Sequence, residues 1–211
     1  GAYHQQVLTI WAGLLEQAKD PSARDDAILN RSRTYVNLAS LYYSMGQYGT
    51  SRSFVDLAFA DRSKVLEPDD PKLLSIQELY ADLEAAAGDH AKAAELETRY
   101  LQACERRFGK RSEQYTRALS KVARSLDSAG DHEHADPLFK EAIVLQRSMA
   151  DPRTDPVLAE MLLAHAEILS GRKAFGDALP EVNEAREILV RIHGPMHRKV
   201  AQCRIIAAQA L

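Results

Sequence analysis

The stretch Leu83-Glu-Ala-Ala-Ala-Gly88-Asp-His90 decides the fold, because the chain carries it more than once. In it an apolar helical segment ends at a glycine and a polar turn, as expected at a helix C-terminus, and further helical sequence follows. Similar stretches surround Gly46 and Gly130, so successive copies are 42 residues apart. A fourth copy, Ile168-Leu-Ser-Gly-Arg-Lys-Ala-Phe175, follows one residue out of step. A fixed period of this length indicates an array of repeated structural units.

Each repeated unit has the pattern of two amphipathic helices. Apolar residues recur at helical spacing over 35–42 and again over 54–65. A connection such as Glu67-Pro-Asp-Asp-Pro71 then closes the unit, because proline ends one helix and suits the start of the next. We predict an all-α fold, a right-handed α-solenoid (superhelix) of antiparallel helix pairs with about ten helices. The predicted parts of this single array over 1–211 are a lone helix at 3–19, repeats at about 22–66, 72–108, 113–150 and 156–193, and a terminal helix at 197–211.

Pro137 lies inside the second helix of the third repeat, and Pro180 lies at the matching point of the fourth. A proline in a helix interior removes one backbone hydrogen bond and costs roughly 3 kcal/mol. We expect the third repeat's second helix to begin near 132 and continue to about 149, with a slight bend. The cost should be small there, because some amides near a helix start lack helical partners anyway.

Composition and charge exclude several classes of protein. With 45% hydrophobic and 27% charged residues in a chain of 211, a folded protein is expected rather than a disordered one. The net charge of −3 gives no overall basic field, so nucleic acid is not an expected partner. No apolar run reaches about 18 residues, which predicts no membrane insertion. Cys104 and Cys203 show neither metal spacing nor a disulfide pattern, and no secretory signal is visible, which favours a reducing, cytoplasmic location.

The two ends of the sequence each carry a single helix. The segment 3–19 has the pattern of a repeat's second helix, and 197–211 has the pattern of a first helix. The sequence also starts Gly1-Ala2, without methionine. We therefore expect either a piece cut from a longer polypeptide, from which a targeting segment could be missing, or an array capped by these helices.

The repeats resemble a known family. Tyr35-Val-Asn-Leu-Ala-Ser-Leu-Tyr42, Ala135-Asp-Pro-Leu-Phe-Lys-Glu-Ala142 and Lys64-Val-Leu-Glu-Pro-Asp-Asp-Pro71 are similar to segments of tetratricopeptide repeats. The 42-residue period resembles the kinesin-light-chain type of that repeat, and the resemblance spans 22–211. It implies a concave groove, lined by the first helix of each repeat, that binds a peptide or protein.

The groove residues are predicted as the first-helix positions that face neither neighbour. Asn37 matches the family's asparagine that hydrogen-bonds a bound peptide backbone, but Leu79, Lys121 and Ala164 stand at that place in the later repeats. Asn37 is therefore either a direct ligand contact or a solvated surface residue. The predicted set is Arg33, Asn37, Ser40, Tyr43, Ser75, Glu78, Asp82, Arg117, Ser120, Lys121, Arg124, Glu160, Leu163 and Glu167.

The charges in this set are banded. Arg117, Lys121 and Arg124 lie on one face of a helix, and acidic pairs from the second and fourth repeats flank them. Two readings stay open. The faces are either solvated or paired with each other across the groove, or they form a banded groove that reads an acidic-then-basic segment of a partner.

No motif for chemistry is found. His132-x-His134 and the pair His193 and His197 lack the third ligand that a metal needs, so exposed loop histidines are expected. His165 stands where leucine is usual, which predicts a satisfied, partly buried histidine or else a pH-sensitive contact. No phosphate-binding loop or nucleophile–base pair is visible. We expect no enzyme, no catalytic residue, no cofactor and no metal.

The leading functional hypothesis is a scaffold for protein–protein interaction that binds a peptide or protein segment in the groove. The alternative is a regulatory or structural arm of a larger multidomain protein, or a self-association module. Neither nucleic acid nor membrane insertion is expected.

Overall fold

The structure, a computed structural model, describes residues 2–149 and 151–209. Ten helices joined by short connections make up this part of the chain, which confirms the all-α prediction and the expected number of helices. They are α1 (Ala2–Gln17), α2 (Pro21–Ser44), α3 (Tyr48–Arg62), α4 (Pro71–Ala86), α5 (His90–Phe108), α6 (Glu113–Ser128), α7 (His132–Arg147), α8 (Pro156–Gly171), α9 (Phe175–His193) and α10 (Arg198–Gln209).

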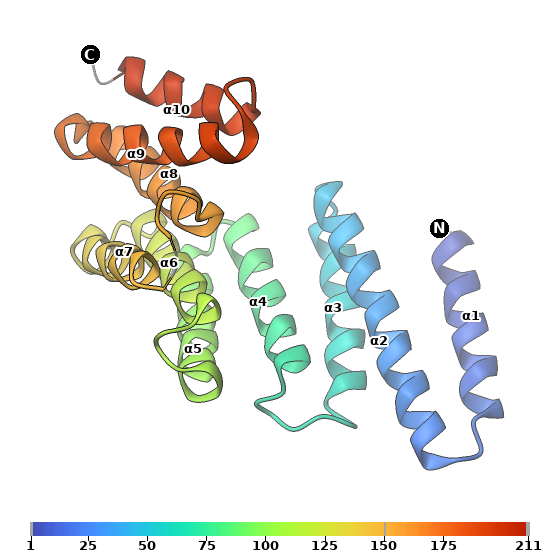
Figure 1. Ribbon diagram of the computed structural model, residues 1–211. Helices are drawn as coiled ribbons and strands as arrows, with labels where there is room; N and C mark the ends of the chain where they lie inside the picture. The colour runs from blue at the N-terminus through green and yellow to red at the C-terminus, as the bar shows by residue number, and fades with distance from the viewer. Residues whose placement is uncertain (1, 150, 210–211) are drawn as a thin grey trace. The chain divides into compact units, whose positions relative to one another are not determined.

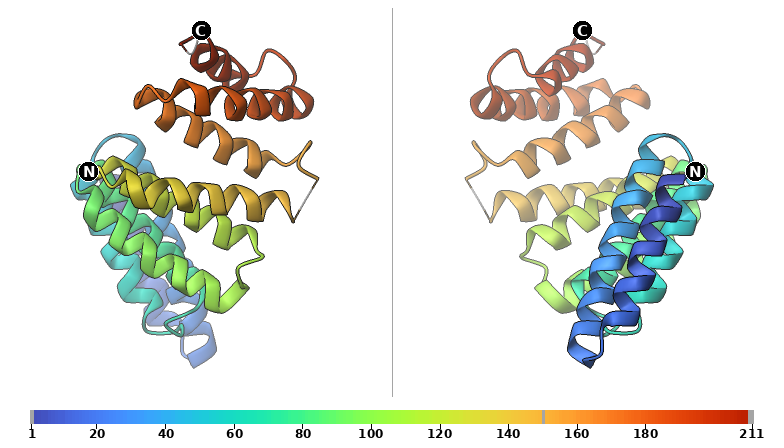
Figure 2. Two further views of the ribbon diagram at one scale, coloured as in Figure 1. Left: turned by 90° about the vertical axis from the view of Figure 1, so that its left-hand side faces the viewer. Right: turned by 90° about the vertical axis from the view of Figure 1, so that its right-hand side faces the viewer.

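The helices fall into two compact units (Figure 1). The first, Gly1–Asp89, contains α1 to α4, and the second, His90–Leu211, contains α5 to α10. Each unit is a stack of antiparallel helices, the architecture of an α-solenoid; in the second, α7, α8, α9 and α10 follow one another as neighbours (Figure 2). The single continuous array and its right-handed twist stay predictions.

Side-chain caps start the first helix of each repeat. Asp20, Asp70 and Asp155 precede α2, α4 and α8, and each accepts a hydrogen bond from a backbone amide of the first turn. A proline follows each of these aspartates, where its missing N–H costs nothing. Ser112 caps α6 in the same way, through the amide of Tyr115 at 3.3 Å. The predicted connections therefore act as helix starts for a local chemical reason.

The repeat period is visible in the second helices. These begin at Tyr48, His90, His132 and Phe175, so the spacing of 42 residues holds twice and lengthens by one in the fourth repeat. The turn before each carries one residue in the left-handed region. Gly46, Gly88 and Gly130 have φ of 71°, 86° and 88°, and Lys173 takes the same role with φ of 61°. The fourth copy therefore keeps the turn geometry without the glycine that suits it.

Pro137 and Pro180 are each the sixth residue of their helices, α7 and α9. This is later than the first four amides, which lack helical partners in any case. Pro137 therefore leaves the carbonyl of Glu133 without its helical donor, and the low cost of this proline stays a prediction. Glu133 and Pro137 are both exposed, so water can reach that carbonyl. Helix α7 runs through the proline and ends at Arg147.

Aromatic rings and small residues pack the first unit. The ring of Phe54 on α3 stacks on that of Tyr42 of α2, with ring centroids 5.6 Å apart. The centroid of the Tyr35 ring lies 6.2 Å from that of Phe54. Ser51 and Ala58, two small residues of α3, are buried and let α2 and α3 approach closely. At the far end of the pair, Arg31 and the buried carboxylate of Asp61 form a bidentate ion pair at 2.6 and 2.7 Å.

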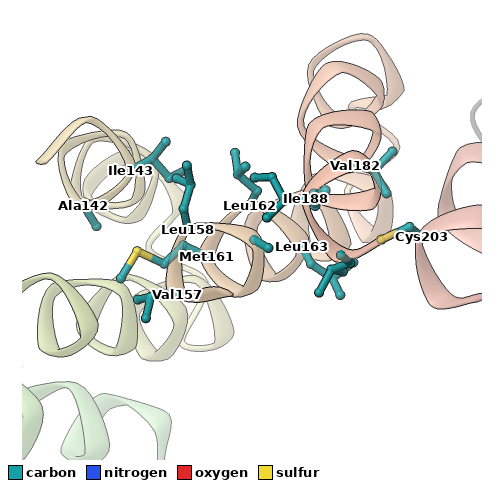
Figure 3. Close-up of a cluster of buried hydrophobic side chains, with 14 of the residues drawn as sticks. Ala142, Ile143, Val157, Leu158, Met161, Leu162, Leu163, Val182, Ile188 and Cys203 are labelled. Atoms are coloured by element: carbon teal, nitrogen blue, oxygen red, sulfur yellow. The ribbon is translucent and has the colours of Figure 1, made fainter. Parts of the chain in front are cut away.

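Helix α8 is the centre of the second unit. It is apolar on most of its surface, and Figure 3 shows Leu158, Met161 and Leu162 lying between side chains of α7 and α9, including Ile143 and Ile188. All five are buried. A helix that is apolar nearly all round is expected where neighbours cover it on two sides.

Buried polar side chains connect two of the helix pairs, α2–α3 and α6–α7, to the helix that follows. In the second unit, the Thr116 hydroxyl donates to Gln146 at 2.6 Å, and Gln146 donates to Asp155, the cap of α8, at 2.7 Å. In the first unit the matching position is Arg62, which donates to the hydroxyls of Ser32 and Ser75. Burial lowers the pKa of the Arg62 guanidinium. We name these groups the Gln146 joint and the Arg62 joint.

Candidate functional site

The predicted groove residues of the first unit come from α2 and α4. Arg33, Asn37 and Ser40 are exposed and lie at successive turns along one stripe of α2. Glu78 and Asp82 lie one turn apart on α4 and are half-buried. A cavity of about 180 Å³, lined in part by Ser40 and Asp82, opens between α2, α3 and α4.

This cavity, which we name the Tyr43 pocket, brings together three predicted residues and five that the prediction missed. Ser40, Tyr43 and Asp82 line it, whereas Arg33, Asn37 and Glu78 do not. The remaining lining residues are Ala39, Ser51, Val55, Leu79 and Leu83.

The geometry of the Tyr43 pocket is fixed by hydrogen bonds and ring packing. At its base the Ser51 hydroxyl donates to the carbonyl of Ala39 at 2.8 Å. The Tyr43 ring packs edge-on against Tyr48, with centroids 5.3 Å apart and planes at 60°. Its hydroxyl donates to the main-chain carbonyl of Asp82 at 3.4 Å. Tyr43 therefore reaches from α2 to α4 and forms one wall.

The pocket is lined at position 55 by a smaller side chain than the one at the matching position of α7. Val55 is the eighth residue of α3, and Phe139 is the eighth residue of α7 in the second unit. Phe139 is fully buried and stacks on His165 with centroids 4.7 Å apart. A valine in that place leaves room that a phenylalanine ring would fill. Comparing aligned positions between repeats could have revealed the pocket from sequence.

In the second unit, two of the predicted charges, Arg117 and Glu160, pair with each other and with further residues. Arg117 of α6 binds Glu113 at 2.7 Å and Glu160 of α8 at 3.3 Å. Glu160 also binds Lys199 of α10 at 2.5 Å. Glu167 accepts a hydrogen bond from the side chain of Gln202. These contacts fit the reading in which the charged faces pair across neighbouring helices.

The carboxyl of Glu160 responds to these partners. Burial acts to raise its pKa, but hydrogen bonds and charges from Lys199 and Arg117 outweigh burial, so the pKa lies below its ordinary value. Arg124 is exposed further along α6, and Lys121 is half-buried.

Two predicted groove residues of the second unit are wrong. Ser120 and Leu163 are both buried, with 5% of their surface exposed. Both lie on helix faces covered by neighbouring helices, and Leu163 belongs to the apolar cluster around α8.

His165 belongs to a buried charged cluster in the second unit. It is 1% exposed, more than the partial burial expected of it. Its Nδ1 lies 2.8 and 3.0 Å from the two carboxylate oxygens of Glu181, and its Nε2 lies 3.8 Å from Asp136. Arg172 binds the same Asp136 at 2.5 Å. Nε2 of His165 has no hydrogen-bond partner among the described residues, so the expected satisfied histidine is satisfied on one side only.

The two predicted histidine pairs lie in surface contacts. His132 and His134 are exposed and bind Asp127 and Asp131 at 2.6 and 2.8 Å. His193 and His197 stack on each other with centroids 4.4 Å apart. Over 2–149 and 151–209, no group of three or more metal-ligating side chains is found. In the same residues, no helix has both the length and the apolar character needed to cross a membrane.

Comparisons with known proteins agree with these features. Residues 30–106 match the family model described as tetratricopeptide repeat. The crystal structure of BtubC (BKLC) from P. vanneervenii covers 100% of this chain and 83% of its own, with a TM-score of 0.77 and 17% identity. A protein of Podosopora anserina, described as a kinesin light chain with nearly identical TPR-like repeats, covers 85% of each chain with a TM-score of 0.69 and 18% identity. A variant of it gives a TM-score of 0.70. No curated protein matches the chain. At these identities the solved structures establish the fold.

Proposed function

We propose that this chain, whose fold is that of tetratricopeptide repeats of the kinesin-light-chain type, binds a peptide segment of a partner protein along the first helices of its repeats. Tetratricopeptide repeats in general mediate protein–protein interaction. The finer proposal concerns the surface used, which is the face that carries α2 and α4 in the first unit and α6 and α8 in the second.

The observation that carries the proposal is the Tyr43 pocket. Its volume of about 180 Å³ equals that of about six water molecules at roughly 30 Å³ each, which suits one amino-acid side chain. The pocket opens beside the exposed stripe of Arg33, Asn37 and Ser40. Side-chain amides, hydroxyls and guanidinium groups can donate to a peptide backbone, and an anchored side chain beside such groups is a common mode of peptide recognition.

Charge recognition in the second unit is proposed for Lys121 and Arg124. Arg117 on the same helix binds Glu113 and Glu160. Lys121 and Arg124 continue the same face of α6. The banded-groove hypothesis therefore proposes that an acidic residue of the partner binds to Lys121 and Arg124 on α6.

A selection from a library of random peptides displayed on phage tests the proposal. Peptides enriched on the wild-type protein should bind the Val55→Phe variant at least about tenfold more weakly, since a ring at that place fills the pocket. Val144→Phe is the matched control, because Val144 is exposed on α7 and lines no described pocket. Enriched peptides that bind Val55→Phe and wild type equally would overturn the proposed surface.

Self-association or packing on another domain is a second candidate, favoured by large apolar side chains on the outer faces of α1 and α10. Ile10 on α1 and Ile205 on α10 are 61% and 60% exposed. Light scattering over a range of protein concentrations distinguishes the two, because a constant monomer mass would remove self-association. The cytoplasmic location stays a prediction.

A further inference from the structure

We propose that one edge of the second unit docks on the surface of an anionic lipid membrane without spanning it. The edge consists of the connections α5–α6, α7–α8 and α9–α10 with the residues beside them, and we name it the basic edge. Its residues are 106–112, 147–149, 151–155 and 191–198. The inference goes beyond the proposed peptide binding, because the basic edge contains none of the predicted groove residues.

The three connections lie at the same end of the stack of helices. Consecutive helices run antiparallel, so α5, α7 and α9 end where α6, α8 and α10 begin. Figure 2 shows the α7–α8 and α9–α10 connections on one side of the unit. The Nη1 atom of Arg191 donates to the main-chain carbonyl of Arg153 at 3.1 Å, which joins these two connections directly. The side chains of the basic edge can therefore meet one extended surface together.

The α5–α6 connection is strongly basic. Arg106, Arg107, Lys110 and Arg111 are all exposed. The Nζ atom of Lys110 lies 3.5 Å from a carboxylate oxygen of Glu105. Among the described residues, Arg106, Arg107 and Arg111 form no ion pair. Clusters of about four or more cations at a membrane surface attract anionic lipid headgroups.

The other two connections add exposed cations. Arg153 precedes α8, Arg191 lies in the last turn of α9, and Arg198 is the first residue of α10. Arg153 also binds Asp151 at 2.9 Å. Residues 90–211 contain 19 lysines and arginines against 17 aspartates and glutamates, whereas residues 1–89 contain 8 against 13. The protein is acidic as a whole, but the unit that carries the basic edge has an excess of positive charge.

Stabilisation of the helices explains only part of this charge. Arg106 and Arg107 lie in the last turn of α5, where the negative end of the helix dipole favours cations. Lys110 and Arg111 lie just before α6, and Arg198 begins α10, where the dipole disfavours positive charge. The fold gains nothing from these three cations, which indicates that they act on something outside the chain.

Large apolar side chains are exposed beside the cations. Phe108 follows Arg107 and is 37% exposed, and Met196 lies two residues before Arg198 and is 91% exposed. Peripheral membrane surfaces combine cations, which bind headgroups, with apolar side chains, which enter the boundary between headgroups and acyl chains. An acidic protein segment or a nucleic acid would satisfy the cations alone. The two apolar side chains therefore favour lipid as the anionic partner.

The matching connection of the first unit has the opposite charge. It joins α3 to α4 over 63–70 and carries Glu67, Asp69 and Asp70 against Lys64. An anionic surface would repel this connection. The basic edge is thus a property of the second unit's connections and not of the repeat in general.

Flotation of the protein with lipid vesicles tests the proposal. One set of vesicles is phosphatidylcholine alone, and the other contains about 30% phosphatidylserine, which gives a negative surface potential. We expect the protein to float with the anionic vesicles and not with the neutral ones. Binding should weaken at least about tenfold between about 0.05 M and 0.5 M salt, because salt screens the headgroup charges.

Two variants and a control locate the binding surface. Arg107→Glu with Arg111→Glu should weaken binding to the anionic vesicles at least about tenfold. Met196→Ser should weaken it about threefold with an unchanged salt dependence, because it removes apolar contact and no charge. Lys140→Glu with Arg204→Glu makes the same change in net charge at exposed positions within α7 and α10, and should bind as wild type. Thermal melting of each variant verifies that it is folded.

The proposal is overturned if anionic vesicles float no more protein than neutral ones, or if the control variant loses as much binding as the edge variant. Soluble polyglutamate and a DNA oligonucleotide are the competing partners. If either binds through Arg107 and Arg111 while the vesicles do not bind, the basic edge belongs to an acidic protein or to a nucleic acid instead. An unchanged affinity of Met196→Ser for the vesicles would overturn the choice of lipid over these polyanions.

Discussion

Replacing Gln146 with leucine should lower the free energy of unfolding by about 2 kcal/mol, although leucine fits the place. Leu189 occupies the matching position of α9 and is 1% exposed, so no steric conflict is expected. The change removes two buried hydrogen bonds of the Gln146 side chain, one from the Thr116 hydroxyl at 2.6 Å and one to the Asp155 carboxylate at 2.7 Å. Each buried group left unpaired costs about 1–3 kcal/mol. The total stays near the middle of that range, because Thr116 also reaches the Glu113 carbonyl at 3.1 Å and Asp155 keeps two amides of α8.

Urea unfolding followed by circular dichroism measures this loss, and thermal melting should fall by about 4–8 °C for a chain of this length. Gln102→Leu is the control, since Gln102 is exposed on α5 and its change should stay within about 0.5 kcal/mol. The double variant Thr116→Val, Gln146→Leu should lose less free energy of unfolding than the sum of the two single variants. Either single change already removes the hydrogen bond between Thr116 and Gln146. A Gln146→Leu protein as stable as wild type would refute the view that the Gln146 joint stabilises the array.

Four further outcomes can be measured. Lys121→Glu with Arg124→Glu should weaken peptide binding about tenfold and leave the melting temperature nearly unchanged, so a large loss of stability would make these residues structural. Ala142→Arg should destabilise by about 3 kcal/mol or more, since Ala142 is 0% exposed, and a wild-type melting curve would contradict the repeat register. Lys173→Gly should raise the free energy of unfolding by about 0.5–1 kcal/mol, because φ of 61° suits glycine, and an unchanged urea midpoint would count against this. The pKa of Glu160 is lowered on folding, so its stabilisation is present above its unfolded pKa and lost as pH falls through the folded pKa. A carboxyl titration midpoint at or above the ordinary glutamate value would contradict that sign.

The sequence was sufficient to predict the parts of the fold that depend on local signals. The glycine spacing placed the starts of the second helices, because a left-handed turn residue recurs once per period. Aspartate–proline pairs placed the starts of first helices for the same local reason.

The candidate site depends on contacts between helices that lie far apart in the chain. Arg117 and Glu160 are 43 residues apart, so a face-by-face reading of each helix cannot pair them. The Tyr43 pocket is lined by residues of α2, α3 and α4, so it is visible only where three helices meet. The burial of Ser120 likewise follows from a neighbouring helix and not from the pattern of α6 itself.

The Arg62 and Gln146 joints have a consequence for the order of the repeats. Arg62 is satisfied by Ser32 and Ser75, whereas Gln146 is satisfied by Thr116 and Asp155. If two repeats changed places, a buried guanidinium or amide would face a neighbour without the matching groups, at a cost of a few kcal/mol. Near-identical repeats can exchange places through gene recombination or pair out of sequence while the chain folds. Each joint therefore favours one particular neighbouring repeat, so the buried hydrogen bonds specify the order of these repeats in addition to the covalent chain.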